Sequence, residues 1–178
     1  GPCTALDTAC SSALVALPRV AGVSSTGVEE PKKTQAASTA LPAVACGVGH
    51  LTENETAAFA AAGMLSPRGR CHAFDARADG YARAEACGAA VVDDSGPWRT
   101  LGTQVASDGR SASLAAPNGA AQRRLLQGID AASGVLEAHG TGTALGDPVE
   151  VGAIASLPGA WSLMACKAVL GPSEAAAA

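Results

Sequence analysis

The chain has 178 residues, of which 48% are hydrophobic, and this is enough for one domain or a large piece of one with a buried core. Its formal net charge of −4 and its lack of any Lys/Arg cluster beyond single pairs exclude nucleic acid as a partner. No apolar run approaches the roughly 20 residues that span a bilayer, and no segment is typical of a signal peptide, so we expect a cytoplasmic protein without a membrane span.

Small side chains dominate the composition, since only 3% of the residues are aromatic and 21 are glycine. Such residues pack closely and suit helices that lie on a sheet, which predicts an α/β fold. The six cysteines include no C-x-x-C pair and no histidine at a metal-ligand spacing, so we expect no metal site and no disulfide framework. Five of them are interpreted as buried structural thiols: Cys3, Cys46, Cys71, Cys87 and Cys166.

The first elements are a helix, a loop and a strand. The run "CSSALVAL" from Cys10 predicts the opening turns of a helix that Pro18 breaks or kinks after Leu17, because proline lacks an N–H group. Residues 22–39 are polar and rich in Gly, Ser and Thr, which predicts a solvated loop. Residues 40–48 then form an apolar run typical of a buried strand.

Capping signals mark the next helices. Thr52 and Glu55 have capping-box spacing before "TAAFAAA", and Gly63 is suited to end that helix. The run "ACGAAVV" at 86–92 predicts a strand, and "NGAAQRRLLQ" predicts a helix that starts near Asn118.

The last third contains a strand, a glycine-rich turn and a helix. "SGVLEAHG" at 133–140 predicts a buried strand that ends in His139. Asp147, Pro148 and Glu150 then have the N-cap, N1 and N3 spacing of a helix over 148–157. The spacing of the glycines between the predicted strand and the predicted helix differs by one residue from that of a dinucleotide-binding loop, which argues against a nicotinamide cofactor.

Cys10 and His139 are the candidate catalytic residues. A cysteine at a helix N-terminus faces unpaired N–H groups, which favour thiolate over thiol; the alternative is a buried cysteine that caps a core helix. A histidine between a strand end and glycines points into a crevice and could serve as the partner of a nucleophile; the alternative is a satisfied core histidine.

Four segments together resemble the β-ketoacyl synthase domains of type I polyketide and fatty acid synthases: "GPCTALDTACSSALVAL", "MLSPRGRCHAFDARADGYARAEACGAAVV", "DGRSASLAAPNGAAQ" and "LEAHGTGTALGDPVE". The resemblance implies a partial thiolase-like fold with αβαβα layers and mixed sheets covered by helices. It also implies that residues 1–178 are a fragment of a single ketosynthase-like domain, truncated at both ends, with sheet edges and apolar faces left open.

The same resemblance implies roles for individual residues. Cys10 matches the acyl-accepting nucleophile and His139 the first catalytic histidine, while Thr141 and Thr143 match residues that line the channel for a pantetheine arm. Lys167 matches the lysine that orients that histidine or the substrate carboxylate. The implied partners are an acyl carrier protein, whose phosphopantetheine takes the place of a cofactor, acyl and malonyl thioesters, and a second copy in a homodimer of the intact parent.

One departure bears directly on activity, because Pro172 stands where the family has its second catalytic histidine. Proline cannot donate a hydrogen bond from its side chain or its nitrogen. Three functions therefore stay open: acyl loading followed by decarboxylative condensation, acyl transfer or holding without elongation, and a degenerate structural or docking module.

Overall fold

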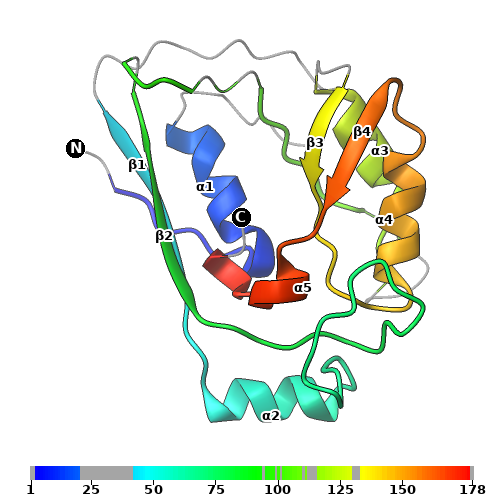
Figure 1. Cartoon of the computed structure of the whole chain (residues 1–178). Helices are drawn as coiled ribbons and strands as arrows, with labels where there is room; N and C mark the ends of the chain where they lie inside the picture. Colours follow the sequence, from blue (N-terminus) through cyan, green and yellow to red (C-terminus); the bar gives the residue numbers. More distant parts are fainter. Residues whose placement is uncertain are drawn as a thin grey trace. The chain divides into compact units, whose positions relative to one another are not determined.

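The computed structural model describes residues 3–20, 42–93, 95–98, 100, 102–109, 111, 116–129 and 133–176 (Figure 1). The loop predicted at 22–39 lies outside the described residues. The elements in chain order are the 3₁₀ turn η1 (Ala9–Ser11), α1 (Ser12–Val20), β1 (Ala43–Gly49), α2 (Glu53–Ala61), β2 (Ala86–Val92), α3 (Gly119–Gln127), β3 (Ser133–Glu137), α4 (Gly146–Ile154), β4 (Ala160–Met164), α5 (Lys167–Leu170) and the 3₁₀ turn η2 (Glu174–Ala176).

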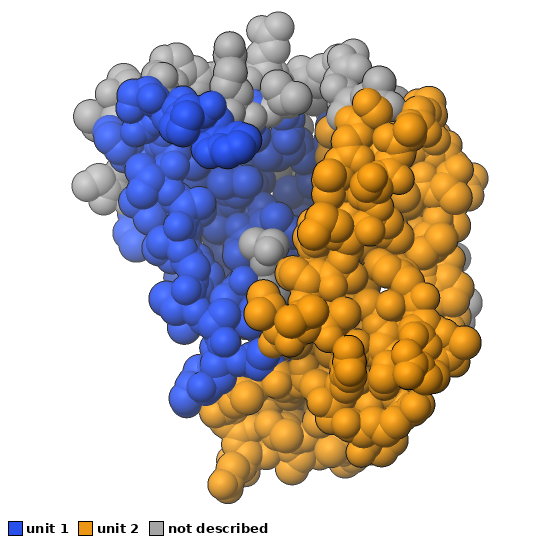
Figure 2. All heavy atoms as spheres, viewed as in Figure 1, with its two compact units in different colours: residues 1–50, 84–105, 173–178 blue, residues 51–83, 106–172 orange. Residues whose placement is uncertain are grey.

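The chain divides into two compact units, shown in different colours in Figure 2. Unit 1 comprises Gly1–His50, Ala84–Val105 and Ser173–Ala178, and unit 2 comprises Leu51–Arg83 and Ala106–Pro172. Each unit contains one described two-stranded sheet.

In unit 1, β1 pairs with β2 in antiparallel register, from Ala43 opposite Val92 to Gly49 opposite Ala86. Helix α1 and turn η2 pack against β1. Glycine makes this close approach possible, because a Cβ on Gly47 would lie 2.6 Å from the carbonyl oxygen of Ala175. The predicted strand is therefore confirmed, and one of its faces is covered.

The other face of this sheet is open. Ala45 is buried, whereas Val44 and Val48 beside it are 54% and 61% exposed, and Val91 on β2 is 65% exposed. Because side chains alternate along a strand, these valines share the face opposite Ala45. The expectation that apolar sheet faces are left open is confirmed for the described residues.

Most of the cysteines depart from the expected burial. Cys71 is buried as predicted, but the prediction of burial is wrong for the other four, which are exposed. Cys46 lies between Val44 and Val48 on β1 and so belongs to the open face.

Unit 2 contains a strand–helix–strand arrangement. Strands β3 and β4 are parallel, from Ser133 opposite Ala160 to Glu137 opposite Met164, and α4 forms the connection between them. Helices α3 and α4 pack together, with Ala121, Ala153 and Ile154 buried. Strand β4 was not predicted, although a parallel partner of β3 requires a crossover such as α4.

The capped helices form as their sequences predict. The Thr52 hydroxyl oxygen accepts a hydrogen bond from the Glu55 N–H at the start of α2, at 3.3 Å. The Asn118 side chain accepts from the N–H groups of residues 120 and 121 at the start of α3. Helix α1 differs from expectation, because it continues through Pro18 to Val20. Pro18 lies in its last turn, so the missing N–H removes one hydrogen bond without preventing two further helical residues.

Candidate functional site

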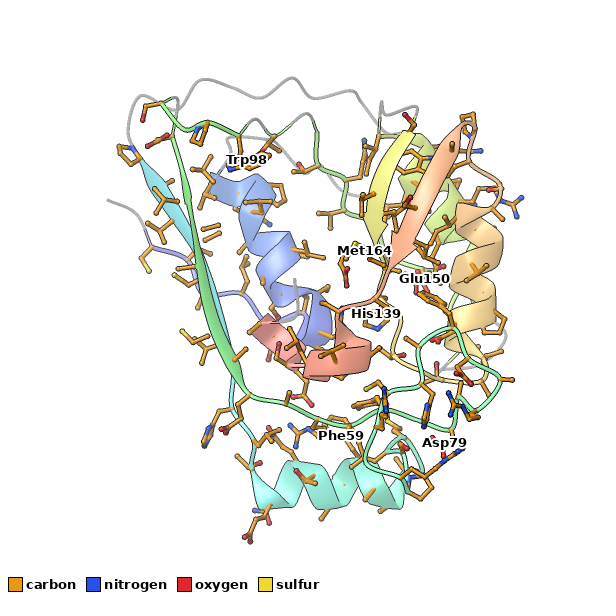
Figure 3. All side chains as sticks on the ribbon, in the orientation of Figure 1. Phe59, Asp79, Trp98, His139, Glu150 and Met164 are labelled. Atoms are coloured by element: carbon orange, nitrogen blue, oxygen red, sulfur yellow. The ribbon has the colours of Figure 1, made fainter. Side chains whose placement is uncertain are left out.

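The loop between β3 and α4 carries His139, and a carboxylate on α4 fixes where it begins. The N–H groups of His139 and Gly140 donate to the two carboxylate oxygens of Glu150, at 2.6 and 2.9 Å. The side chains of His139 and Glu150 are labelled in Figure 3. Just before them, the Ala138 N–H donates to the carbonyl of Met164, which extends the pairing with β4. His139 is therefore held at the carboxyl end of the sheet.

A second carboxylate on the same helix holds the rest of the loop. Asp147 is 4% exposed, and it accepts from the N–H groups of Phe74, Gly142 and Thr143 at 2.7, 3.1 and 3.3 Å. The prediction that Asp147 is the N-cap of its own helix is wrong, since α4 begins at Gly146. The Thr143 hydroxyl oxygen instead accepts from the Gly146 N–H, at 3.1 Å.

The sequence does not reveal that Asp147 and Glu150 pair with the loop. Their spacing of three residues predicts instead that they cap the helix in which they lie. The signal that could have indicated their role is the run of glycines just before them, because a loop that passes close to a helix start offers its own N–H groups to any carboxylate there.

Glycines allow this loop to lie against its neighbours. Gly142 has φ +78°, and a Cβ there would lie 2.7 Å from the His72 nitrogen. Gly140 has φ +44°, and a Cβ there would lie 2.7 Å from the Ala165 Cβ. The glycines thus bring the loop against the segment that includes His72 and the residues before α5.

His139 is accessible over part of its surface although protein surrounds much of its ring, so it is not a fully buried core histidine. Partial burial of the ring, and next the positive charge of Lys167, lower the pKa of His139, and the charges of Glu150 and Asp147 oppose this shift. The imidazole is therefore neutral at neutral pH and can donate one hydrogen bond and accept another.

Lys167 is 7% exposed at the first residue of α5, so the structure places it in a buried position close enough to influence His139. The neighbouring Cys166 N–H donates to Glu137 at 2.7 Å. Burial would raise the pKa of Glu137, but hydrogen bonds from Cys166 and the charge of Lys167 outweigh it, and the pKa is lowered. This part of the unit thus keeps a lysine and a carboxylate near the histidine.

The remaining matched residues of unit 2 lie close to these in the chain. Thr141 is half-buried between two glycines of the loop. Pro172 is buried and follows Gly171, which ends α5 with φ +76°. Unit 2 therefore contains every residue matched to the catalytic machinery except the nucleophile.

Cys10 belongs to unit 1. It lies in η1, immediately before α1, as the sequence predicts. Cys10 is exposed, which contradicts the alternative of a buried cysteine that caps a core helix.

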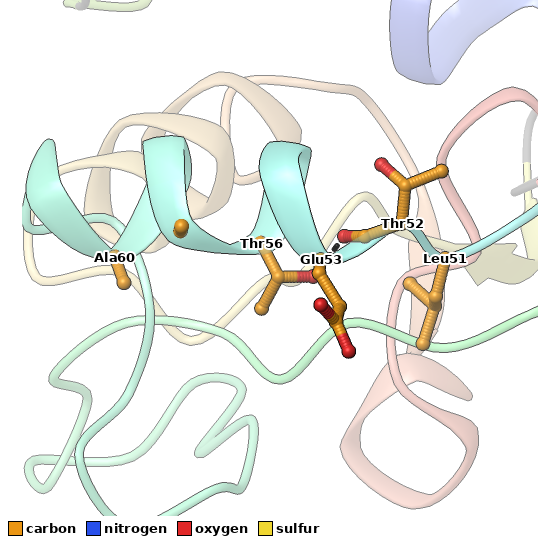
Figure 4. A pocket seen from close by; sticks show the side chains of 6 residues that line it. Leu51, Thr52, Glu53, Thr56 and Ala60 are labelled. Carbon is orange, nitrogen blue, oxygen red and sulfur yellow. Dashed lines mark hydrogen bonds between the residues drawn. The ribbon is translucent and has the colours of Figure 1, made fainter.

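A shallow hollow lies along α2 in unit 2 (Figure 4). Its volume is about 420 Å³, and its lining residues are Leu51, Thr52, Glu53, Thr56, Ala57 and Ala60. None of the predicted site residues lines it. Within the described ranges, no helix is long and apolar enough to cross a membrane, and no three His, Cys, Asp or Glu residues gather as metal ligands would.

Comparison with known families gives two adjoining matches. Residues 36–95 match the model of the β-ketoacyl synthase N-terminal domain, and residues 99–178 match that of the β-ketoacyl synthase C-terminal domain. Together the two matches include most of the chain.

Individual proteins show the same similarity. The chain is 41% identical to a phenolphthiocerol/phthiocerol polyketide synthase of Mycobacterium tuberculosis, over 99% of this chain and 12% of that protein. It is 39% identical to an erythronolide synthase of Saccharopolyspora erythraea, over 86% of this chain and 4% of that protein.

Solved structures agree with the sequence matches. An oxazolomycin ketosynthase domain from Streptomyces albus superposes with a TM-score of 0.77 at 32% identity, over 99% of this chain and 33% of that one. A ketosynthase from module 6 of the bacillaene synthase of Bacillus subtilis gives 0.75 at 28% identity, over 97% and 33%. The chain thus spans about a third of these ketosynthases and a much smaller part of the polyketide synthases.

Proposed function

Because the chain belongs to the β-ketoacyl synthase family and has a partial thiolase-like ketosynthase fold, we propose that it takes part in polyketide biosynthesis. It would first bind an acyl group covalently as an acyl-enzyme and then form a β-ketoacyl product. The acyl and malonyl groups would arrive as thioesters on the phosphopantetheine arm of an acyl carrier protein, so the chain would need no cofactor of its own. The observation that carries the proposal is the loop 139–143, which two carboxylates hold in place beside Lys167.

In the first step Cys10 accepts the acyl group. Its thiolate attacks the thioester carbonyl, a new C–S bond forms, and the bond to the pantetheine sulfur breaks, so that the released pantetheine thiolate takes up a proton. The exposed position of Cys10 before α1 supports this role, because a carrier-bound thioester must reach the sulfur.

In the second step a malonyl thioester loses carbon dioxide. The resulting enolate carbon attacks the Cys10 thioester, a C–C bond forms, and the Cys10 thiolate leaves. His139 would donate a hydrogen bond to the enolate oxygen, and its lowered pKa supports a neutral donor. Lys167 would orient His139 or the malonyl carboxylate through its charge, and Thr141 and Thr143 would line the pantetheine path.

The test is intact-mass spectrometry of the chain after incubation with an acyl-pantetheine thioester, with peptide mapping of the adduct. We expect one acyl group, confined to Cys10 and absent from a Cys10→Ala variant. Adducts spread over the exposed cysteines, or no adduct, would instead favour the structural or docking module.

A second candidate is acyl transfer or holding without elongation, and Pro172 favours it. Loss of one oxyanion donor typically lowers a rate about 10²- to 10³-fold, and acyl loading does not need that donor. If this candidate holds, acyl-loaded chain given malonyl-pantetheine forms almost no β-ketoacyl product, and Pro172→His raises that product sharply. Equal product from both chains would contradict the limiting role of Pro172.

A further inference from the structure

The residue before Cys10 has an unusual backbone conformation. Ala9 has φ +54°, in the left-handed region that residues with a Cβ rarely adopt. Cys10 follows directly, so the Ala9 dihedral angles set the direction from which the Cys10 side chain leaves the backbone. Neighbouring groups must stabilise this conformation, because an alanine left alone would populate negative φ.

Ser12 supplies that stabilisation from both sides of Ala9. Its hydroxyl oxygen accepts from the Thr8 N–H at 2.9 Å, and the same hydroxyl donates to the Ala9 carbonyl at 2.7 Å. The Ser12 backbone N–H also donates to the Ala9 carbonyl. Ser12 is 7% exposed, so water competes little for these bonds.

Neighbouring polar groups do not duplicate this arrangement. Ser11 is half-buried, and its hydroxyl donates to the carbonyl or hydroxyl oxygen of Thr8, in contacts that are open to solvent and do not reach Ala9. Asp7 accepts from the Ala9 N–H at 3.1 Å, but that contact is exposed to solvent. Ser12 is therefore a buried side chain that bonds to the Thr8 N–H and to the Ala9 carbonyl, the two backbone groups that flank the Thr8–Ala9 peptide.

We propose that Ser12 is a positioning residue for the nucleophile: its hydroxyl holds Ala9 at positive φ and so fixes the direction of the Cys10 sulfur. The inference rests on the proposed acyl-accepting role of Cys10. It goes beyond that role by naming the side chain that makes Cys10 ready to attack. Ser12 itself forms no bond to the substrate and exchanges no proton with it.

The first test compares Ser12→Ala with the matched control Ser11→Ala in single-turnover acylation of Cys10 by an acyl-pantetheine thioester. Ser12→Ala should lower the maximal rate about tenfold, because two buried hydrogen bonds are lost. The half-saturating thioester concentration should stay unchanged, since the substrate pocket is not altered. Ser11→Ala should stay within about twofold of the original chain. Equal rates for the two variants would overturn the proposal.

The second test uses glycine, which adopts positive φ without a steric cost. In an Ala9→Gly background, Ser12→Ala should lower the rate only about two- to threefold, because the conformation no longer needs the same support. The same loss in both backgrounds would mean that Ser12 does not act through Ala9, and would also overturn the proposal.

A parallel measurement separates this inference from the proposed function. Iodoacetamide labelling of Cys10 relative to the exposed Cys46, followed by peptide mapping, reports on the turn without any thioester. The original chain could fail to be acylated while Ser12→Ala still changes the ratio of Cys10 to Cys46 labelling, with a smaller change in the Ala9→Gly background. That result would contradict the proposed function and support the positioning role of Ser12. A ratio that Ser12→Ala leaves unchanged overturns the positioning, whether or not acylation occurs.

Discussion

Asp147 offers the sharpest prediction about unit 2, because one buried carboxylate there serves three backbone N–H groups. Its Oδ1 accepts from Gly142 and Thr143, and its Oδ2 accepts from Phe74. Asp147→Ala leaves all three donors without this partner. Asp147→Asn keeps an oxygen for the first two and places an NH₂ group against the Phe74 N–H, so it should cost less than alanine.

The magnitude follows from the number of bonds. A buried donor left unsatisfied costs roughly 1–3 kcal/mol, and a hydrogen bond to a charged group is worth about 1.5–3 kcal/mol. Water that enters the truncated site recovers part of this, so we expect Asp147→Ala to destabilise the unit by about 3 kcal/mol or more, and Asp147→Asn by about 1–2 kcal/mol. These values correspond to roughly 100-fold and tenfold changes in the opening equilibrium.

The buried thiol of Cys71 provides the assay, because it is 3% exposed and lies in the same unit. Burial raises the pKa of Cys71, so it should react with iodoacetamide only when the unit opens, and its labelling rate measures that opening. The matched control is Asp93→Ala, since Asp93 also accepts from two N–H groups, but in an exposed turn. If Asp147→Ala changes the Cys71 labelling rate by no more than Asp93→Ala does, the reasoning is refuted.

Three further predictions concern pH, packing and capping. The pKa of His139 is lowered in the folded chain from the ordinary value of 6.5, so the unfolded chain binds more protons once the pH falls below that value. The free energy of unfolding measured in urea should therefore fall from about pH 7 to about pH 5, and it should fall less in His139→Gln. A Cβ on Gly49 would clash with the Ser173 carbonyl oxygen, whereas none of the described residues lies within 4 Å of a Cβ on Gly88, so Gly49→Ala should lower the urea midpoint and Gly88→Ala should not. Thr52→Ala should cost about 1 kcal/mol of unfolding free energy through loss of its cap, and an unchanged midpoint would contradict this.

Local chemistry made several elements predictable from the sequence. Thr52 and Asn118 each accept N–H groups within three residues, so the helix starts that they mark depend on no distant part of the chain. The predicted helix that follows Cys10 is confirmed. The predicted strand before His139 is also found, but it ends at Glu137, and it is mostly exposed instead of buried.

Distant contacts account for what the sequence did not reveal. Asp147 bonds to Phe74, which lies 73 residues away, and no spacing rule connects the two. The exposure of Cys46 was likewise hidden, because an apolar run gives no indication of which strand face is covered. The left-handed Ala9 could not be predicted from its residue type, since alanine disfavours positive φ.

These contacts also separate two effects that Pro172 could have. The N–H bonds that hold the loop 139–143 go to Glu150 and Asp147 on α4, and none of them involves residue 172. His139 should therefore keep its place whether residue 172 is proline or histidine, so that Pro172→His changes the available hydrogen-bond donor and leaves the loop as it is. A gain of product in that variant would then report on the chemistry of condensation, whereas a change in Cys71 labelling would reveal that Pro172 also acts on the fold.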